Sequence, residues 1–497
     1  MMKNKVSLIN LISNLMLQFV TIISGFILPK IILTSFGSEV NGLVSSLTQL
    51  LGYISLVEGG ISGVIIASLY KPLYEKDDYK LSSIVKTTNK FYKKIGFIFI
   101  AYAFVVSFIY PLVVKTSFSY EYVVTLSLIL SISLIIQYMF SLTLRNILVA
   151  DKKIYISSFL QTFIIILNII LALISIKILP SIHILKLITG GLFILQPIVY
   201  GAYINKKYKI RKDVKIDNDL INKRWNGLAV NIAAFIHNST DITVLTMFTD
   251  LKTVSIYGVY SLIVVGLKQV VTTIETALTP SLGQEYAKEN IENLNNKLDL
   301  FEYVMCLAVF LLFTLGALLV TPFVMIYTKG ITDTNYYQPL FGALILIAEA
   351  IYMIKSPHLA LAYSTNKFKE ITKACYIEAA INIIISVVLV PKTGLIGVAI
   401  GTIIAMLYRT IYQINFTKTI IKNRNIKETY KKIGIFILGT IIGVFICLMV
   451  VPKVEFAIYS WIISAIIYTI IMIIDYYIIS KLFFKKEFNF VKKYIFK

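Results

Sequence analysis

The stretch that decides the fold is WNGLAVNIAAFIHNSTDITVLTMF (Trp225–Phe248), followed after a short turn by VSIYGVYSLIVVGLKQVVTTIETALTP (Val254–Pro280). Each half is mostly apolar and about as long as an α-helix that crosses a bilayer. Four ionisable residues interrupt this apolar sequence: His237, Asp241, Lys268 and Glu275. An ionisable group near mid-bilayer costs roughly 2.5 to 3.5 kcal/mol on insertion scales, so such groups usually face a water-filled cavity or a substrate path.

Helical spacing groups these four residues into two pairs. His237 and Asp241 are four residues apart and share one helix face. Lys268 and Glu275 are seven residues apart, which is about two helical turns, so they also share one helix face. We therefore expect two walls of a polar cavity inside a bundle that is embedded in lipid.

The composition is that of a polytopic membrane protein. Of the 497 residues, 57% are hydrophobic and 15% are charged, and the apolar residues come in long runs separated by short polar segments. The formal net charge of +22 is spread along the chain without a dense basic domain. We interpret these basic residues as determinants of membrane topology and as contacts with membrane lipids, and we expect no nucleic-acid partner.

We predict an all-α fold with about fourteen transmembrane helices. The predicted spans are 7–29, 40–69, 95–114, 122–144, 154–176, 182–204, 225–248, 253–280, 300–327, 338–362, 373–391, 394–416, 433–451 and 457–480. Loop charge supports this count, because 37 of the 48 lysines and arginines fall in alternate segments and only seven in the intervening turns. By the positive-inside rule, both ends of the chain are cytoplasmic.

A faint internal repeat suggests two lobes. FGSEVNGLVSSL, before the second predicted span, resembles DLKTVSIYGVYSL, before the eighth, and places Gly42 opposite Gly258. The loop after each carries apolar residues at helical spacing, which predicts amphipathic helices on the cytoplasmic surface. We divide the chain into four parts: a six-helix lobe at 1–205, a basic cytoplasmic linker at 206–224, a second six-helix lobe at 225–417, and two extra helices with a basic tail at 418–497.

Several classes of activity lack the sequence features that they need. No predicted external loop is long enough for a folded catalytic domain, and no GxxxxGK[ST] phosphate loop is present. The three cysteines lie in or beside apolar runs without CxxC spacing, which argues against a disulfide framework or a metal site. We expect a protein that is not an enzyme and has no cofactor, with Na⁺ or H⁺ as a possible coupling ion.

Further ionisable residues lie deep in other predicted spans. Glu58 is on the second, Glu349 and Lys355 are on the tenth, and Arg409 is on the twelfth. The alternative interpretation is that such residues form interhelical ion pairs, for example Lys268 with Glu275, that only fix the packing. Lys186 lies near the external end of the sixth span and is expected to snorkel to the surface.

Two segments resemble a known family. SFGSEVNGLVSSLTQLLGYISLVEGGISGVIIASLY (Ser35–Tyr70) is similar to the opening of the bacterial O-antigen and capsule polysaccharide repeat-unit flippases, and VVLVPKTGLIGVAIGTIIAMLYRTIYQI (Val387–Ile414) to their eleventh and twelfth helices. These flippases belong to the multidrug, oligosaccharidyl-lipid and polysaccharide exporter superfamily. The similarity in layout extends over essentially the whole chain.

The resemblance implies a flippase of the bacterial cytoplasmic membrane. It would move undecaprenyl-pyrophosphate-linked oligosaccharide repeat units from the inner to the outer leaflet by alternating access. A polysaccharide polymerase and a chain-length regulator are the protein partners that the resemblance implies. Candidate residues for the anionic head group are Lys268, Lys355, Arg409 and His237. Candidates for ion coupling or gating are Asp241, Glu275, Glu58 and Glu349. Two alternatives remain: a cation-coupled drug or small-metabolite antiporter of the same fold, and a membrane scaffold without transport activity.

Overall fold

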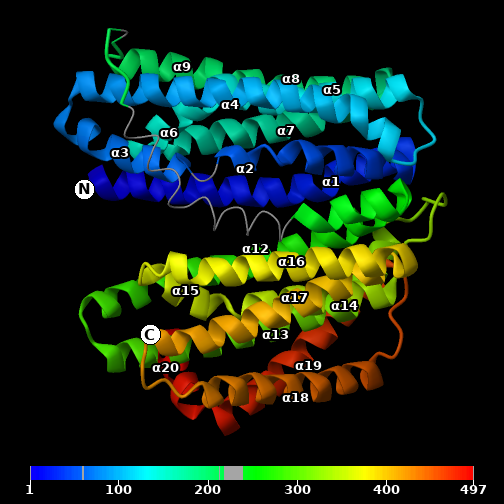
Figure 1. Ribbon diagram of the computed structural model, residues 1–497. Helices are drawn as coiled ribbons and strands as arrows, with labels where there is room; N and C mark the ends of the chain where they lie inside the picture. Colours follow the sequence, from blue (N-terminus) through cyan, green and yellow to red (C-terminus); the bar gives the residue numbers. More distant parts are fainter. Residues whose placement is uncertain (1, 59–60, 212, 218–238, 496–497) are drawn as a thin grey trace. The chain divides into compact units, whose positions relative to one another are not determined.

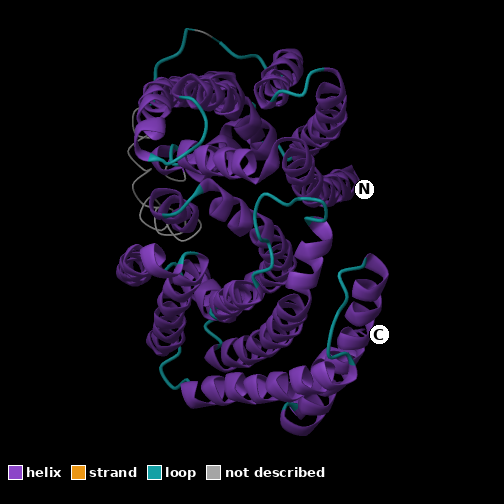
Figure 2. Ribbon diagram, turned by 90° about the vertical axis from the view of Figure 1, so that its right-hand side faces the viewer, coloured by secondary structure: helices purple, strands orange, loops and turns teal. Residues whose placement is uncertain are grey.

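The computed structural model describes residues 2–58, 61–211, 213–217 and 239–495. Every regular element in these ranges is a helix, and no strand occurs among them (Figure 2). The predicted all-α class is therefore confirmed. The chain separates into two compact units, Met1–Ser255 and Ile256–Lys497.

Unit 1 contains the helices from α1 to α9 (Figure 1). They are α1 (Met2–Gly52), α2 (Ser55–Glu58), α3 (Ile61–Glu75), α4 (Asp78–Val113), α5 (Tyr120–Ile136), the π-helix η1 (Gln137–Ser141), α6 (Leu142–Ala150), α7 (Ile154–Ile178), α8 (Ile182–Gly191), the 3₁₀ turn η2 (Leu192–Ile194) and α9 (Leu195–Lys207). Residues 239–248 are helical and also belong to this unit.

Unit 2 begins inside a long helix. Its elements are α12 (Leu251–Ala287), α13 (Ile291–Tyr327), α14 (Pro339–Ile354), α15 (Ser356–Ser364), α16 (Phe368–Thr393), α17 (Leu395–Phe416), the 3₁₀ turn η3 (Thr417–Thr419), α18 (Ile426–Val450), α19 (Ile458–Phe483) and α20 (Lys485–Ile495). The first turn of α12 lies in unit 1 and the rest in unit 2, so this helix runs across the boundary.

Twelve helices in the described ranges are long and apolar enough to cross a membrane, so the chain is a multi-pass membrane protein. The first of them, Val6–Glu58, has 53 residues, far more than the ~20 that one crossing needs. It bends at Gly37, whose φ of 83° is open to glycine at little cost. The predicted span 225–248 lies mostly outside the described residues, so the count of fourteen stays a prediction.

The four-part division made from the sequence also stays a prediction, but the structure shows where residues 239–255 pack. They lie against the part of α1 that follows Gly37. The Asn41 amide donates a hydrogen bond to Ser255 Oγ (2.8 Å), and Thr246 Oγ1 donates one to Ser46 Oγ (2.8 Å). Gly42 permits this approach, because a Cβ atom at position 42 would overlap the carbonyl oxygen of Leu251.

Gly42→Ala is expected to destabilise unit 1 by about 1–3 kcal/mol, the usual cost of forcing an extra carbon into a packed contact. The measurement is the thermal unfolding midpoint of the purified protein in detergent. Gly25→Ala on the same helix is the matched control, since nothing lies within 4 Å of a Cβ at that position. Equal midpoints for the two variants would show that α1 and Leu251 do not pack in this way.

Candidate functional site

The polar site of unit 2 is centred on Tyr352 of α14. Lys268 of α12 forms an ion pair with Glu349 of α14 (Nζ to Oε2, 3.2 Å), and both side chains are mostly buried. The Lys268 ammonium lies 4.5 Å from the centre of the Tyr352 ring. The Lys355 ammonium lies 3.1 Å from the centre of the same ring, which is cation–π geometry. One aromatic ring thus contacts two cations, both of which were predicted from the sequence.

Lys355 is the less compensated of these cations. It is 2% exposed, and its Nζ has no hydrogen-bond partner among the described residues. The charges of Glu378, Arg409, Lys268 and Glu349 act on it. A buried ammonium without hydrogen bonds is costly, because it has lost its water and gained little in return. Such a group can bind an anionic ligand.

Glu275 and Arg409 differ in how far they are already engaged. The Glu275 carboxylate forms no hydrogen bond or ion pair with the described residues, although Lys355 acts on it electrostatically. Arg409 is 2% exposed, pairs with Glu378 (Nε to Oε2, 3.3 Å) and donates to the Ile371 carbonyl oxygen (3.1 Å). The pairing of Lys268 with Glu275 that the sequence suggested is wrong, since Lys268 pairs with Glu349 instead.

In unit 1, Glu58 lies in a pocket of hydroxyl groups. Ser62 Oγ (2.8 Å), Tyr92 Oη (3.4 Å) and Tyr138 Oη (3.3 Å) each donate to its carboxylate. Asn146 supports Tyr92 through a 3.2 Å hydrogen bond. Tyr138 lies on the π-helix η1, a kind of irregularity that is frequent at functional sites. Glu58 has no cationic partner among the described residues, so this carboxylate could take up a proton or a small cation.

Asp241 is also buried in unit 1, at 8% exposure, and acts electrostatically on Tyr53. The Tyr53 hydroxyl lies 2.8 Å from Thr243 Oγ1 and 3.4 Å from the carbonyl oxygen of Ser239. His237, which the sequence places beside Asp241, lies outside the described residues. The predicted site residues that the structure describes therefore fall in two groups: Glu58 and Asp241 in unit 1, and Lys268, Glu275, Glu349, Lys355 and Arg409 in unit 2.

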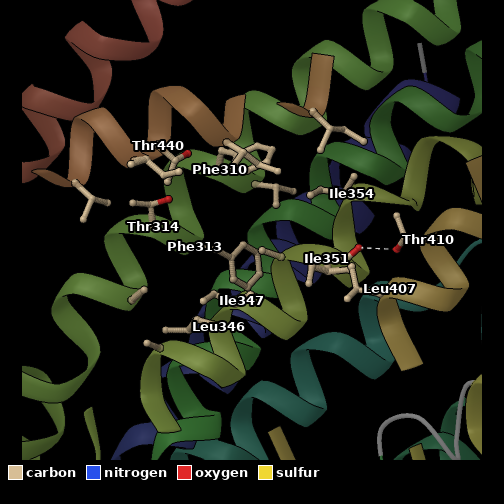
Figure 3. A pocket seen from close by; sticks show the side chains of 18 of the residues that line it. Phe310, Phe313, Thr314, Leu346, Ile347, Ile351, Ile354, Leu407, Thr410 and Thr440 are labelled. Atoms are coloured by element: carbon tan, nitrogen blue, oxygen red, sulfur yellow. Dashed lines mark hydrogen bonds between the residues drawn. The ribbon is translucent and has the colours of Figure 1, made fainter. Parts of the chain in front are cut away.

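An apolar groove of about 670 Å³ lies between α13, α14, α17 and α18, all in unit 2 (Figure 3). Its walls include Phe310, Phe313, Ile347, Ile351, Leu407 and Ile441. Thr410 lines it too, but its hydroxyl is turned away to the Ile351 carbonyl oxygen (2.9 Å). Ile347, Leu407 and Ile441 are 47%, 43% and 60% exposed, so the groove is open to its surroundings.

Helix α14 separates this groove from the polar site. Leu346, Ile347, Ala350, Ile351 and Ile354 recur at helical spacing and line the groove. At 100° per residue, Glu349 and Tyr352 point away from that stripe. One helix thus presents an apolar face to a lipid-accessible groove and a charged face to the site around Tyr352.

Sequence reasoning missed a second charged cluster in unit 2, centred on Glu302 of α13. The Glu302 carboxylate is 3% exposed and accepts from Arg424 (2.5 Å), Lys432 (3.0 Å) and Thr429 (3.1 Å). His358 Nε2 of α15 lies 3.4 Å from it. Burial lowers the pKa of Arg424 while Glu302 and Asp299 raise it, and the net result is a raised pKa. We call Glu302, Arg424, Lys432 and His358 the Glu302 cluster.

A signal for the Glu302 cluster was present in the sequence. Glu302 lies just inside the predicted span 300–327, and Arg424 is one of only five arginines in a lysine-rich chain. Arginine is the residue that proteins favour for buried ion pairs. An acid at a span edge and an arginine between two spans could therefore have been considered together.

No known protein family and no curated protein sequence matches this chain. Solved structures do. The lipid II flippase MurJ in an inward closed conformation aligns with a TM-score of 0.74 at 16% identity, over 94% of this chain and 98% of that one. A multidrug resistance MATE family transporter of the MOP superfamily aligns in its inward-facing form with a TM-score of 0.62 at 14% identity, over 85% of this chain and 99% of that one. In its outward-facing form the TM-score is 0.56 at 15% identity, over 85% of this chain and 96% of that one. The chain has the fold of these exporters. Its predicted superfamily is consistent with that fold, whereas the polysaccharide flippase family is not distinguished within it.

Proposed function

We propose that this protein is a flippase for lipid-linked oligosaccharides, which moves undecaprenyl-pyrophosphate-linked repeat units from the cytoplasmic to the external leaflet for polysaccharide export. The observation that carries the proposal is the arrangement around α14. Its charged face offers Lys268 and Lys355 to an anionic head group, and its other face borders an apolar groove. A substrate with a diphosphate head and an isoprenoid tail matches both faces.

The fold supports the same proposal. Among the solved structures that share it, the lipid II flippase has a higher TM-score than the multidrug transporters and aligns over more of this chain. Transport would proceed by alternating access of the two units and would not require ATP, because the chain carries no phosphate loop. Membrane lipids would surround the tail, and a polymerase would consume the product.

A cation-coupled drug or small-metabolite antiporter is the second candidate. The observation that favours it is the hydroxyl-lined Glu58, because a carboxylate without a cationic partner can exchange a proton or Na⁺. The two cations around Tyr352 count against a cationic drug, since like charges repel.

A leaflet-access assay in proteoliposomes distinguishes the two candidates. One arm follows an undecaprenyl-pyrophosphate oligosaccharide, the other a fluorescent cationic drug, each with and without an imposed proton or Na⁺ gradient. We expect movement of the lipid-linked sugar alone, and a dependence on one gradient would identify the coupling ion. Movement of the drug alone would establish the antiporter, and movement of neither would contradict both candidates.

Filling the apolar groove is expected to slow transport of the lipid-linked sugar. Ala350→Trp places a large side chain among the groove residues of α14, so a lipid chain can no longer occupy that section. The rate of leaflet exchange should fall about three- to tenfold, on the order of 1 kcal/mol. Leu438→Trp on α18 is the control, because Leu438 is 64% exposed and does not line the groove. Equal rates for both variants would exclude a role for the groove.

A further inference from the structure

Unit 1 contains a second, smaller cavity that the proposed function does not use. It has a volume of about 400 Å³ and lies in the angle of α1 at Gly37. Leu28, Pro29 and Ile32 line it from the helix segment before the bend. The segment after the bend contributes Asn41, Ser45, Thr48 and Gln49, which recur at helical spacing and therefore share one face.

Lys186 of α8 closes the opposite wall of this cavity. The sequence predicted that Lys186 would snorkel to the surface; in the structure its side chain is half-buried and lines this cavity. Within the described part of the chain, Lys186 forms no ion pair, and no described residue that lines the cavity is acidic. The cavity therefore carries one positive charge that no residue in the described ranges neutralises.

The remaining polar groups suit a neutral or anionic oxygen-rich ligand. Asn41 is 5% exposed and its amide is engaged with Ser255 Oγ (2.8 Å), so it is held rigidly. Ser45 Oγ donates to the Asn41 carbonyl oxygen (2.8 Å), which leaves its lone pairs available as acceptors. Thr48 and Gln49 are more exposed and can both donate and accept. Hydroxyl and amide groups beside a lysine form a common arrangement for phosphoryl and sugar oxygens.

The cavity lies at one end of unit 1. Ile182 and Leu185 of α8 belong to the same core cluster as Ile32, Val114 and Val123. These residues surround the turns at the ends of α1 (before Gly37), α4 and α7, all of which loop charge predicts to be external. Lys186 is only one turn into α8, roughly 6 Å from its start at 1.5 Å per residue.

We propose that this cavity is a phosphoryl-binding site in the external half of unit 1, with Lys186 as its cation and Thr48 and Gln49 as hydrogen-bond donors. An uncompensated cation in a membrane helix is costly, and an anionic ligand offsets that cost. The inference rests on the proposed function for one point, the identity of the phosphorylated lipid as a polyprenyl diphosphate. The site would then hold the head group on the side from which it is released.

Binding is tested without transport, so that failure of this site and failure of the flippase proposal are separate results. The full-length protein is placed in phosphatidylcholine nanodiscs and titrated with undecaprenyl diphosphate, with phosphatidylglycerol, and with the uncharged undecaprenol. Lys186→Met removes the charge and keeps the side-chain length, Lys186→Arg keeps the charge, and Lys177→Met replaces an exposed lysine at the same end of unit 1.

We expect Lys186→Met to weaken binding of undecaprenyl diphosphate at least tenfold, Lys186→Arg to stay within threefold of the parent, and undecaprenol binding to be unchanged in all variants. If Lys186→Met instead weakens the binding of phosphatidylglycerol, the result supports the phosphoryl site and assigns it to a phospholipid head group. Unchanged affinity of Lys186→Met for both phosphorylated lipids overturns the proposal. If Lys186→Met does not fold, Gln49→Leu gives the same test through a second residue of the cavity, with an expected loss of about threefold.

Discussion

Glu302→Gln is expected to destabilise the protein by about 3–5 kcal/mol, the usual cost of removing one partner from a buried ion pair. The Glu302 carboxylate lies 2.5 Å from Arg424 and 3.0 Å from Lys432, and all three side chains are nearly inaccessible to solvent. Without the charge on Glu302, the two buried cations keep, among the described residues, only the partly exposed Asp299 as a counter-ion. The measurement is unfolding of the purified protein in mixed micelles, monitored by its helical circular dichroism.

The matched control is Glu428→Gln on α18. Glu428 is exposed and accepts a hydrogen bond from the Asn425 amide (3.1 Å), so its replacement should stay within about 0.5 kcal/mol. The double variant Glu302→Gln/Arg424→Gln closes the cycle, and we expect its loss to be smaller than the sum of the single losses because the two residues contact each other. Additive losses would show that Glu302 and Arg424 are not coupled.

The Glu302 cluster connects three helices of unit 2. Glu302 is on α13, His358 is on α15, and Thr429 and Lys432 are on α18. His358 is further held by Thr417 Oγ1, 2.9 Å from its Nδ1. The cluster therefore ties α18, the first of the two extra helices, to the rest of unit 2 at one end of the apolar groove. Breaking it should loosen the α18 wall of that groove.

The transmembrane helices were predictable because length and apolarity alone identify them. Predicted spans 154–176 and 433–451 correspond to α7 (Ile154–Ile178) and α18 (Ile426–Val450), because bilayer thickness sets the length of the apolar run. The polar segments between spans were harder. The loop after the second predicted span was expected to form an amphipathic helix on the cytoplasmic surface. Its apolar residues Leu81, Ile84 and Phe91 are instead part of α4, a continuous helix of 36 residues that also includes the next span. Amphipathic spacing predicts a helix but does not say whether the next span continues it.

The sequence was sufficient to predict which residues form the polar site, but not which of them form ion pairs with one another. Lys268, Glu349 and Lys355 were identified because ionisable groups in apolar runs are rare. The pair Lys268 and Glu275 was suggested by their seven-residue spacing, but two helical turns separate their backbones by about 10.5 Å. The true partner of Lys268 is 81 residues away in the chain. Pairing between helices depends on tertiary packing, which spacing within one helix does not contain. The cavity beside Lys186 could not be predicted for a similar reason, since the bend of α1 at Gly37 helps to form it.

Lys268→Met is expected to reduce transport of the lipid-linked oligosaccharide at least a hundredfold, about 3 kcal/mol in the barrier. The Lys268 side chain is 22% exposed, so unlike the fully buried Arg409 it can reach a ligand while it pairs with Glu349. Removing it takes one of two cations from the ring of Tyr352 and leaves the Glu349 carboxylate to repel an anionic head group. The rate is measured in the leaflet-access assay and normalised to the amount of reconstituted protein. Lys288→Met, which removes a lysine whose side chain is 65% exposed, should leave it unchanged.

The double variant Lys268→Met/Glu349→Gln decides what the lysine does. If Lys268 serves only to neutralise Glu349, removing both charges restores an uncharged pair of similar size, and transport recovers. If Lys268 binds the head group, the double variant lacks that contact and stays as slow as Lys268→Met. We expect the second result, because the double variant leaves Lys355 as one cation beside Tyr352 where the parent protein has two. Full recovery in the double variant would show that the pair is structural and would remove Lys268 from the substrate site.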